Sequence, residues 1–246
     1  MIDRFETQMQ AMQMLSHAQE ITADNLANIN TPGFKGSTVF YRLLNENVDG
    51  VQTQRTLPMQ QTDFSQGELE HTGNQFDLGL NGSGFFMVGD DQENFLTRDG
   101  RFRLDNDGYL VNSSGDKVQG SSGDIHIPEY FKTADLYGND SSLVIGKDGT
   151  IRINDQVHDK IRIVDVDDTS QLERRGNAYF SATDPGMLRE TESAEVMQGY
   201  YEKGNVVPLH EMVDMMRTMQ MFESQQRAIS STDETLSASI NSLGKF

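Results

Sequence analysis

The two ends of the chain constrain its fold most, because both are long amphipathic segments with few residues that break a helix. Residues 1–30 contain no proline or glycine, and their apolar residues recur at three- and four-residue steps. That spacing places them on one face of an α-helix. Polar residues at Gln8, Gln19 and Thr22 interrupt the stripe, and Thr31-Pro32-Gly33 ends the predicted helix. The stripe consists of Met1, Phe5, Met12, Leu15, Leu26 and Ile29.

The C-terminal segment carries a longer stripe of the same kind. Residues at alternating steps of three and four over positions 212–243 are mostly apolar, which is typical of a coiled-coil seam. Pro208 stands where a first-turn proline is favoured, and Asn205 is a suitable upstream cap. A helix over residues 209–243 would be about 50 Å long. The seam consists of Met212, Met215, Met219, Phe222, Gln226, Ile229, Asp233, Leu236, Ile240 and Leu243.

Between the ends lies a segment with frequent turn signals and short alternating runs. Asp99-Gly100, Asp107-Gly108 and Asp148-Gly149 each separate two such runs, and Asp-Gly dipeptides favour tight hairpins. We therefore expect a β-rich domain over residues 76–204, preceded by an extended connector over residues 37–75. Strands are expected at 84–88, 101–104, 109–111, 143–145, 150–153, 161–166 and 178–181.

Together these patterns predict an α+β fold. In this prediction the long N- and C-terminal helices, residues 1–36 and 205–246, pair as a coiled-coil-like stalk that serves as an assembly domain. The hydrophobic content of 35% is low for a single well-filled core, so part of the apolar surface is expected to be buried in partners. The methionines near both stripes fit either a private core or an interface. Because they surround the stripes and are flexible, we interpret them as interface residues.

The charge of the chain excludes a class of partner. Acidic residues outnumber basic ones by 38 to 20, and a net charge of -18 argues against nucleic acid or an anionic membrane surface. Residues 1–36 carry four acids and two bases, and residues 205–246 carry five and three, so the middle holds about -14. Near-neutral ends around an acidic middle suit a filament subunit whose ends are buried between copies.

The sequence contains fragments of motifs for cofactor and metal binding, but none of them is complete. Gly82-Ser83-Gly84 begins like a dinucleotide fingerprint, but the third glycine position is Met87. Asp105-Asn106-Asp107-Gly108 resembles part of a calcium loop, yet Arg103 would occupy its first liganding position. His210-Glu211 lacks the second histidine of a zinc helix. We therefore assign no catalytic residue, no metal site and no cofactor.

The sequence also bears on disulfide formation, export and membrane insertion. Cysteine is absent, which excludes a disulfide framework and a thiolate metal site. The first thirty residues lack the basic start and apolar core of a signal peptide, so we expect no Sec-type export. No stretch approaches the roughly 18 consecutive apolar residues of a membrane span, and we expect no direct membrane insertion.

Three segments, in order along the chain, resemble bacterial flagellar rod and hook proteins. Residues 23–35, ADNLANINTPGFK, are similar to the N-terminal signature of that family. Residues 76–88 and 97–105, which include NGSGFFMV and TRDGRF, are similar to the start of its β domain. Asn205-Val206, Glu211-Met212-Val213, Phe222-Glu223 and Asp233-Glu234-Thr235-Leu236 are similar to its C-terminal helix.

The resemblance implies a structural subunit of the flagellar basal-body rod that is not an enzyme. It implies that paired terminal helices form an inner tube, that the β domain faces outward, and that the tube transmits torque from motor to hook across the periplasm or cell envelope. The implied partners are further copies, other flagellar rod proteins and the flagellar type III export apparatus, which fits the missing signal peptide. The length favours a rod protein over the larger hook subunit. Gln225-Gln226-Arg227 and the short tail after Leu243 favour the proximal rod over the distal rod.

The predicted assembly interface lies on the two terminal helices. Two alternatives remain beside it: a distal rod or hook-type protein of the same family, and a secreted β-domain adhesin or enzyme with oligomerising helices. Tight metal binding, or hydrolysis lost on mutating one carboxylate, would favour the adhesin or enzyme. The predicted interface residues are Phe5, Met12, Leu15, Asn25, Leu26, Asn28, Ile29, Met212, Met215, Met219, Phe222, Ile229, Leu236, Ile240 and Leu243.

Overall fold

The computed structural model describes residues 2–48, 51–89, 93–127, 143–176, 178–191 and 193–243. The chain divides into two compact units. We call Met1–Ala27, Ser37–Asp63 and Val207–Phe246 the helical unit, and Asn28–Gly36 with Phe64–Val206 the β unit. Each unit is therefore built from segments that are far apart in the sequence.

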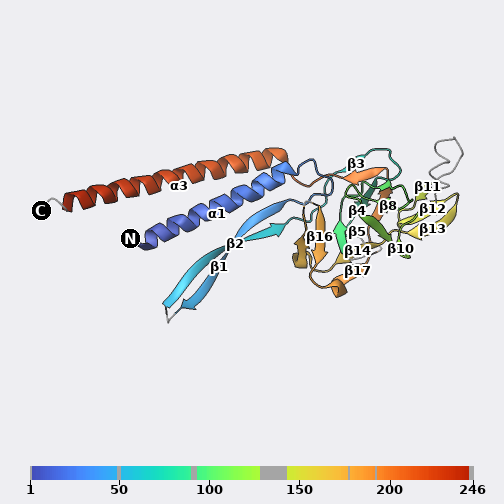
Figure 1. The fold of residues 1–246 in the computed structure, drawn as a ribbon, viewed down its shortest axis with the longest axis horizontal. Coiled ribbons are helices and arrows are strands. Elements are labelled where there is room, and N and C mark those ends of the chain that lie inside the picture. The colour runs from blue at the N-terminus through green and yellow to red at the C-terminus, as the bar shows by residue number, and fades with distance from the viewer. Residues whose placement is uncertain are drawn as a thin grey trace. The chain divides into compact units, whose positions relative to one another are not determined.

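The helical unit contains two helices and a hairpin. Helix α1 (Ile2–Ala27) contacts helix α3 (Pro208–Leu243), and strand β1 (Ser37–Val48) contacts α1 (Figure 1). Strand β2 (Val51–Thr62) pairs antiparallel with β1, with Val48 opposite Val51 and Ser37 opposite Thr62. The segment 37–75, which we expected to be an extended connector, thus contains a long hairpin.

The prediction of a coiled-coil-like stalk is wrong. A coiled coil needs both sets of seam positions turned toward the partner helix. In α3, Met215, Phe222 and Ile229 are half-buried, whereas the alternating positions Met212 and Met219 are 49% and 46% exposed. The structure is instead a sheet-rich α+β fold in which the described residues form two α-helices, one near each end of the chain, and a strand-rich middle.

The ends of the helices agree with the sequence to within a few residues. Helix α3 begins at Pro208, one residue before the predicted start. Helix α1 ends at Ala27, three residues earlier than expected. Asn205, the predicted cap, bonds to two other segments: its Oδ1 accepts a hydrogen bond from the Gly36 amide at 2.8 Å, and its Nδ2 donates to the Ser65 carbonyl at 3.1 Å.

In its described residues, the β unit contains short antiparallel strands and two 3-10 turns. Its first half holds β3 (Leu69–His71), β4 (Leu78–Asn81), β5 (Phe85–Gly89), β6 (Asn94–Thr97), β7 (Arg103–Leu104), β8 (Leu110–Val111), β9 (Lys117–Gly120) and β10 (Gly123–Asp124). Its second half holds β11 (Leu143–Ile145), β12 (Thr150–Ile153), β13 (Gln156–Lys160), β14 (Ile163–Val166), η1 (Thr169–Gln171), β15 (Leu172–Arg174), β16 (Tyr179–Ala182), η2 (Pro185–Met187), β17 (Leu188–Glu190), β18 (Glu195–Gln198) and β19 (Tyr200–Glu202).

The main sheet of the β unit runs in the order β15-β16-β6-β5-β9-β8-β7, with β10 on β9, and with β14 paired to both β5 and β17. Smaller sheets join β11-β12-β13, β18-β4 and β19-β3. The last two pairings matter for function. They place the strands at the start of the β unit against the strands at its end, so Leu69 lies opposite Glu202.

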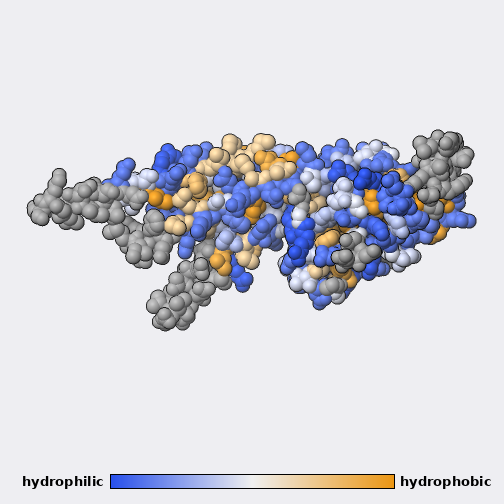
Figure 2. Space-filling view, viewed as in Figure 1, coloured by the Kyte–Doolittle hydropathy of each residue, from blue (hydrophilic) through white to orange (hydrophobic). Residues whose placement is uncertain are grey.

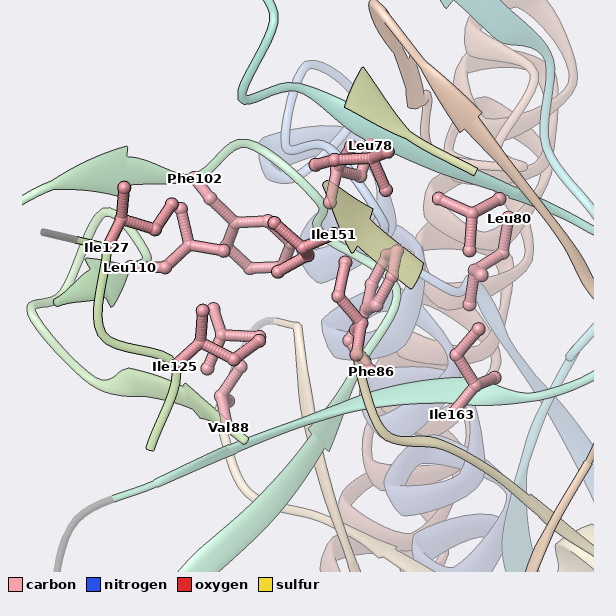
Figure 3. Packing of buried hydrophobic residues seen from close by; sticks show 14 of the residues in the cluster. Leu78, Leu80, Phe86, Val88, Phe102, Leu110, Ile125, Ile127, Ile151 and Ile163 are labelled. Carbon is pink, nitrogen blue, oxygen red and sulfur yellow. The ribbon is translucent and has the colours of Figure 1, made fainter. Parts of the chain in front are cut away.

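Two apolar clusters form the core of the β unit. Strand β5 separates them, because Phe86 and Val88 belong to one cluster and Phe85 and Met87 to the other. Burial on both faces explains why this strand is a continuous apolar run and does not alternate. Figure 3 shows the larger cluster, where side chains from several short strands point toward one another, among them Leu78, Leu80, Phe86, Phe102, Leu110, Ile125, Ile127, Ile151 and Ile163.

Two of the three predicted Asp-Gly hairpins are confirmed. Asp107-Gly108 separates the antiparallel strands β7 and β8, and Asp148-Gly149 separates β11 and β12. The hairpin predicted at Asp99-Gly100 is wrong, because β6 pairs with β5 and β16 and not with β7. A Cβ on Gly100 would lie 1.7 Å from the Leu78 carbonyl oxygen, so this glycine serves a close approach between distant segments.

Candidate assembly interface

Helix α3 presents two stripes of opposite character. Its inward stripe follows helical spacing on the side that packs on α1, where the side chains are half-buried or buried: Glu211, Met215, Thr218, Phe222, Gln225 and Ile229. Its outward stripe lies about a third of a turn further round the helix and contains Leu209, Met212, Met216 and Met219. These four side chains are 68%, 49%, 55% and 46% exposed.

The outward stripe is an apolar surface that nothing in the described part of the chain covers to more than about half. In Figure 2, orange and pale orange side chains gather over the helical unit between the blue polar ones. Single exposed apolar residues are ordinary on a protein surface, but a contiguous row of them marks an interaction site. Methionine side chains are flexible, so such a row adapts to neighbours of different shape.

The structure distributes the other predicted interface residues over several environments. Met12, Leu15 and Leu26 of α1 are half-buried, as is Ile29 just beyond the helix. Among the described side chains of α1, the buried apolar one is Ile21, which the predicted stripe did not include. The side chains of Phe5, Leu236, Ile240 and Leu243 lie outside what the structure describes.

Asn25 is buried inside the helical unit. Its Nδ2 donates to the Ser37 carbonyl at 2.8 Å, and its Oδ1 accepts from the Ser37 amide at 2.9 Å. This reciprocal pair joins the end of α1 to the start of β1. Asn28, in the β unit, is also buried, and its Oδ1 accepts from the Thr31 hydroxyl at 3.2 Å. Asn25 and Asn28 of the family signature thus each make hydrogen bonds within their own unit.

A cavity of about 310 Å³ lies where α1, β1 and α3 meet, and its lining includes Asn25, Tyr41, Glu211, Asp214 and Arg217. Burial raises the pKa of the Glu211 carboxyl, and Asp214 acts in the same direction. A hydrogen bond from Asn25 opposes that shift and links the first turn of α3 to α1. The carboxyl therefore holds its charge less readily than an exposed glutamate does.

An ion cluster in the β unit joins three segments that the sequence analysis did not connect. Lys35 Nζ lies 2.6 Å from Glu202 Oε1, and Arg98 Nη1 lies 3.2 Å from Glu202 Oε2. All three residues are at least 96% buried. Lys35 also donates to the Ser65 carbonyl at 2.6 Å, and Glu202 Oε1 accepts from the Gly67 amide at 2.7 Å.

The cations of this cluster have further partners. Arg98 Nη2 donates to the Gly82 carbonyl at 2.9 Å, and its guanidinium lies 5.2 Å from the centre of the Phe85 ring. Burial lowers the pKa of the Arg98 guanidinium, and the Glu202 carboxylate opposes that shift. Arg174 Nη2 donates to the Lys35 carbonyl. The cluster therefore ties the start of the β unit, its central sheet and its last strand together.

Gly33 fits the same cluster closely. Its φ is +66°, and a Cβ there would lie 2.2 Å from the Asp99 amide nitrogen. The Gly33 amide donates to the Glu202 carbonyl at 2.7 Å. The segments 31–35 and 97–100, which carry the family resemblance, thus meet at Glu202. Sequence reasoning missed Glu202 as their partner, because no local pattern signals a contact over 167 residues.

Among the residues that the structure describes, no group of three or more His, Cys, Asp or Glu side chains is arranged to hold a metal ion. Within the same ranges, no helix has the length and apolar content needed to cross a membrane.

Comparison with known proteins places these features in a family. Residues 5–35 match the family described as flagella basal body rod protein, residues 79–153 match the flagellar hook protein FlgE/F/G D1 domain, and residues 197–243 match the flagellar basal body rod FlgEFG protein C-terminal family. The exposed stripe of α3 falls in the last match, and the buried Lys35 falls in the first.

Individual relatives agree with the family matches over nearly the whole chain. The chain is 30% identical over 248 residues to flagellar basal-body rod protein FlgF of Salmonella typhimurium, covering 93% of each protein. It is 30% identical over 246 residues to flagellar basal-body rod protein FlgG of Buchnera aphidicola, covering 88% of this chain and 90% of the relative. Identity to the FlgF protein of Caulobacter vibrioides is 28% over 244 residues. The chain belongs to the flagellar basal-body rod protein family and is a structural subunit of the rod.

Proposed function

We propose that this subunit builds the rod by burying the outward stripe of α3 against neighbouring rod subunits. The observation that carries the proposal is the exposure of Leu209, Met212, Met216 and Met219, which are each 46% to 68% exposed on one side of the helix. Fully burying one such side chain stabilises a contact by about 1.5–3 kcal/mol. The contact repeats in every subunit, so the modest free energies of the individual contacts add up along the rod.

The inward stripe has a different role in this proposal. Met215, Phe222 and Ile229 are half-buried in the subunit itself and hold α3 on α1. They fix which side of α3 faces outward. The remaining predicted positions on the terminal helices, including Phe5, Met12, Leu15, Leu236, Ile240 and Leu243, belong to the same proposed assembly domain.

The distribution of charge supports an inner and an outer part of the rod. The terminal segments are near neutral, while residues 37–204 carry about -14. Burying near-neutral helices between subunits avoids the cost of desolvating charge, and an acidic outer part stays solvated. We therefore assign the helices to the inner tube and the β unit to the outer part, in a rod that transmits torque from motor to hook.

The partners follow from this assignment. Neighbours in the rod are further copies of the chain and other rod proteins, and the subunit is exported by the flagellar type III apparatus, with a place in the proximal rod. Its work is mechanical, and we assign it no catalytic activity.

The proposal is tested by placing a charge on the outward stripe in cells that carry the variant as the sole copy. Met216→Asp buries an unpaired carboxylate in the proposed contact, so we expect loss of rods and of motility. Ser224→Asp puts the same charge on an exposed polar position of α3 and is expected to leave motility intact. Normal motility with Met216→Asp would contradict the proposal.

A further inference from the structure

The hairpin of the helical unit leaves one of its faces uncovered. Phe40 and Met59 are direct cross-strand partners and are 43% and 40% exposed. Opposed residues of an antiparallel pair project from the same face, so these two side chains form one apolar patch. Arg42 is two residues beyond Phe40, exposed, and on that same face. We call this surface, made by Phe40, Arg42 and Met59, the outer face of the hairpin.

The opposite face of the hairpin is the one that packs on the helices. Tyr41 points to that side, where its hydroxyl donates to the Met14 carbonyl of α1 at 3.4 Å, and Val39 and Tyr41 line the cavity with α1 and α3. A two-stranded hairpin is marginally stable unless a hydrophobic face is covered. In this subunit the helices cover one face, and Phe40 and Met59 on the other face remain open to a partner.

The outward stripe of α3 matches the outer face in chemistry and spacing. Methionine sulfurs make favourable contacts with aromatic rings, and the outer face supplies Phe40. Glu223 is exposed and follows Met219 by one helical turn, about 6 Å along the axis. Arg42 follows Phe40 by about 7 Å along the strand. On both surfaces a charged side chain thus follows an apolar one at nearly the same distance. The two charges, on Glu223 and Arg42, have opposite signs.

Arg227 follows Glu223 by one further turn of α3 and is the basic residue of the helix nearest to the proposed pair in this direction. Its Nε donates to the Glu223 backbone carbonyl at 3.4 Å. The recorded bond goes to the main chain and not to the carboxylate, so it does not occupy the oxygens that Arg42 would meet.

We propose that the outer face of the hairpin in one copy packs on the outward stripe of α3 in a second copy, with Phe40 and Met59 against Met216 and Met219 and with Arg42 paired to Glu223. The two surfaces are different parts of one chain, so the contact is head-to-tail and does not close on itself. Such contacts generate helical assemblies and not closed dimers. The inference rests on the proposed function, because it names what covers the α3 stripe.

Absence of cysteine from the chain allows a direct test by site-specific crosslinking. Two differently tagged copies are produced in the same cells, one with Phe40→Cys and the other with Met219→Cys. Isolated basal bodies are treated with a thiol crosslinker whose reach of about 8–10 Å matches the spacing of packed elements. We expect a covalent dimer that carries both tags, and little dimer when both copies carry Phe40→Cys.

Met221→Cys is the matched control. Met221 is 53% exposed, similar to Met219, but two residues along the helix it points to nearly the opposite side. The pair Met221→Cys and Phe40→Cys is expected to give at least tenfold less dimer than the pair Met219→Cys and Phe40→Cys. Equal yields, or no doubly tagged dimer in rods that contain both tags, would overturn the inference. Assembled rods in that experiment would still support the role of the stripe, so the two proposals fail separately.

A charge exchange provides a second test that does not depend on the cysteine variants. Arg42→Glu and Glu223→Arg each place like charges in the proposed pair, so each is expected to reduce swimming by several-fold. The double variant restores the pair with reversed polarity and is expected to recover most of the motility. A double variant no better than the worse single variant would contradict the inference.

Discussion

Lys35 and Glu202 are 167 residues apart in the sequence, yet their side chains form an ion pair at 2.6 Å with both side chains fully buried. Arg98 joins the same carboxylate from the central sheet at 3.2 Å. Lys35 lies in the short N-terminal segment of the β unit, one residue before that segment ends at Gly36, and Glu202 lies in β19, near the end of the unit at Val206. The cluster therefore ties the short segment 28–36 to the rest of the β unit.

Removal of the shared carboxylate is expected to destabilise the β unit strongly. Glu202→Ala leaves two buried cations without their anion, and breaking a buried ion pair in this way costs about 3–5 kcal/mol. The free energy of unfolding of the β unit, from chemical denaturation of the full chain, measures this loss. Glu70→Ala is the control, because Glu70 meets Lys203 at 2.8 Å on an exposed surface, where a pair contributes about 1 kcal/mol or less. Equal losses for the two variants would contradict the role of the cluster.

Gly33→Ala is expected to destabilise the β unit for two separable reasons. A side chain at positive φ costs about 1–2 kcal/mol, and the new Cβ would also press on the Asp99 amide at 2.2 Å. Gly115→Ala isolates the first reason, because Gly115 also has a positive φ but nothing lies within 4 Å of its Cβ position. The thermal midpoint should therefore fall further for Gly33→Ala, and a smaller fall would rule out the close packing.

The pH dependence of the helical unit is expected to include a contribution from Glu211. Its pKa is raised in the folded chain, so the folded state favours the protonated form. That stability is fully present below the ordinary glutamate pKa of about 4.3 and is lost as the pH rises through the higher folded value. Glu211→Gln should thus raise the thermal midpoint of the helical unit at pH 7 and change it little at pH 4. An unchanged or lowered midpoint at pH 7 would show that the charge helps the helix, as first-turn acids often do.

Phe222→Asp is expected to separate the two stripes of α3. Phe222 is half-buried on the inward stripe, so the charge should lower the helix content of the isolated subunit as well as prevent rods. Met216→Asp should prevent rods with the helix content unchanged, because Met216 is 55% exposed. Circular dichroism of the two purified variants measures the difference. Both should keep the unfolding transition of the β unit, and loss of that transition would place Phe222 in a core shared with the β unit.

Helix α3 and the Asp-Gly turns at 107–108 and 148–149 were predictable because their signals are local. A first-turn proline and a long apolar period favour α3, and at these two positions the Asp-Gly dipeptide favours the tight turn between neighbouring strands. The hairpin of β1 and β2 was missed although Asp49-Gly50 stands between these strands in the sequence, since polar residues hide its alternation.

Other features depended on contacts that no short pattern encodes. The three- and four-residue spacing predicted that Met212 and Met215 both face a partner helix. In the structure Met215 is half-buried beside α1, whereas Met212 is exposed. Asn25, in the last turn of α1, bonds to the backbone of Ser37, and Gly100 allows a close approach to Leu78 and does not form a hairpin. No local pattern in the sequence links Lys35 to Glu202, and only the folded chain brings them together.

The most direct measurement of the central claim is the reactivity of one thiol on the outward stripe, before and after assembly. Because the chain has no cysteine, Met216→Cys introduces a single thiol, at a site that is 55% exposed. The control is Val144→Cys, which introduces a single thiol in the β unit at a site that is 49% exposed. The account predicts that both thiols react rapidly with maleimide in the free subunit, whereas in isolated rods Met216→Cys is protected by at least tenfold and Val144→Cys is not. Equal reactivity of Met216→Cys in the free subunit and in the rod would contradict burial of this stripe by neighbouring subunits.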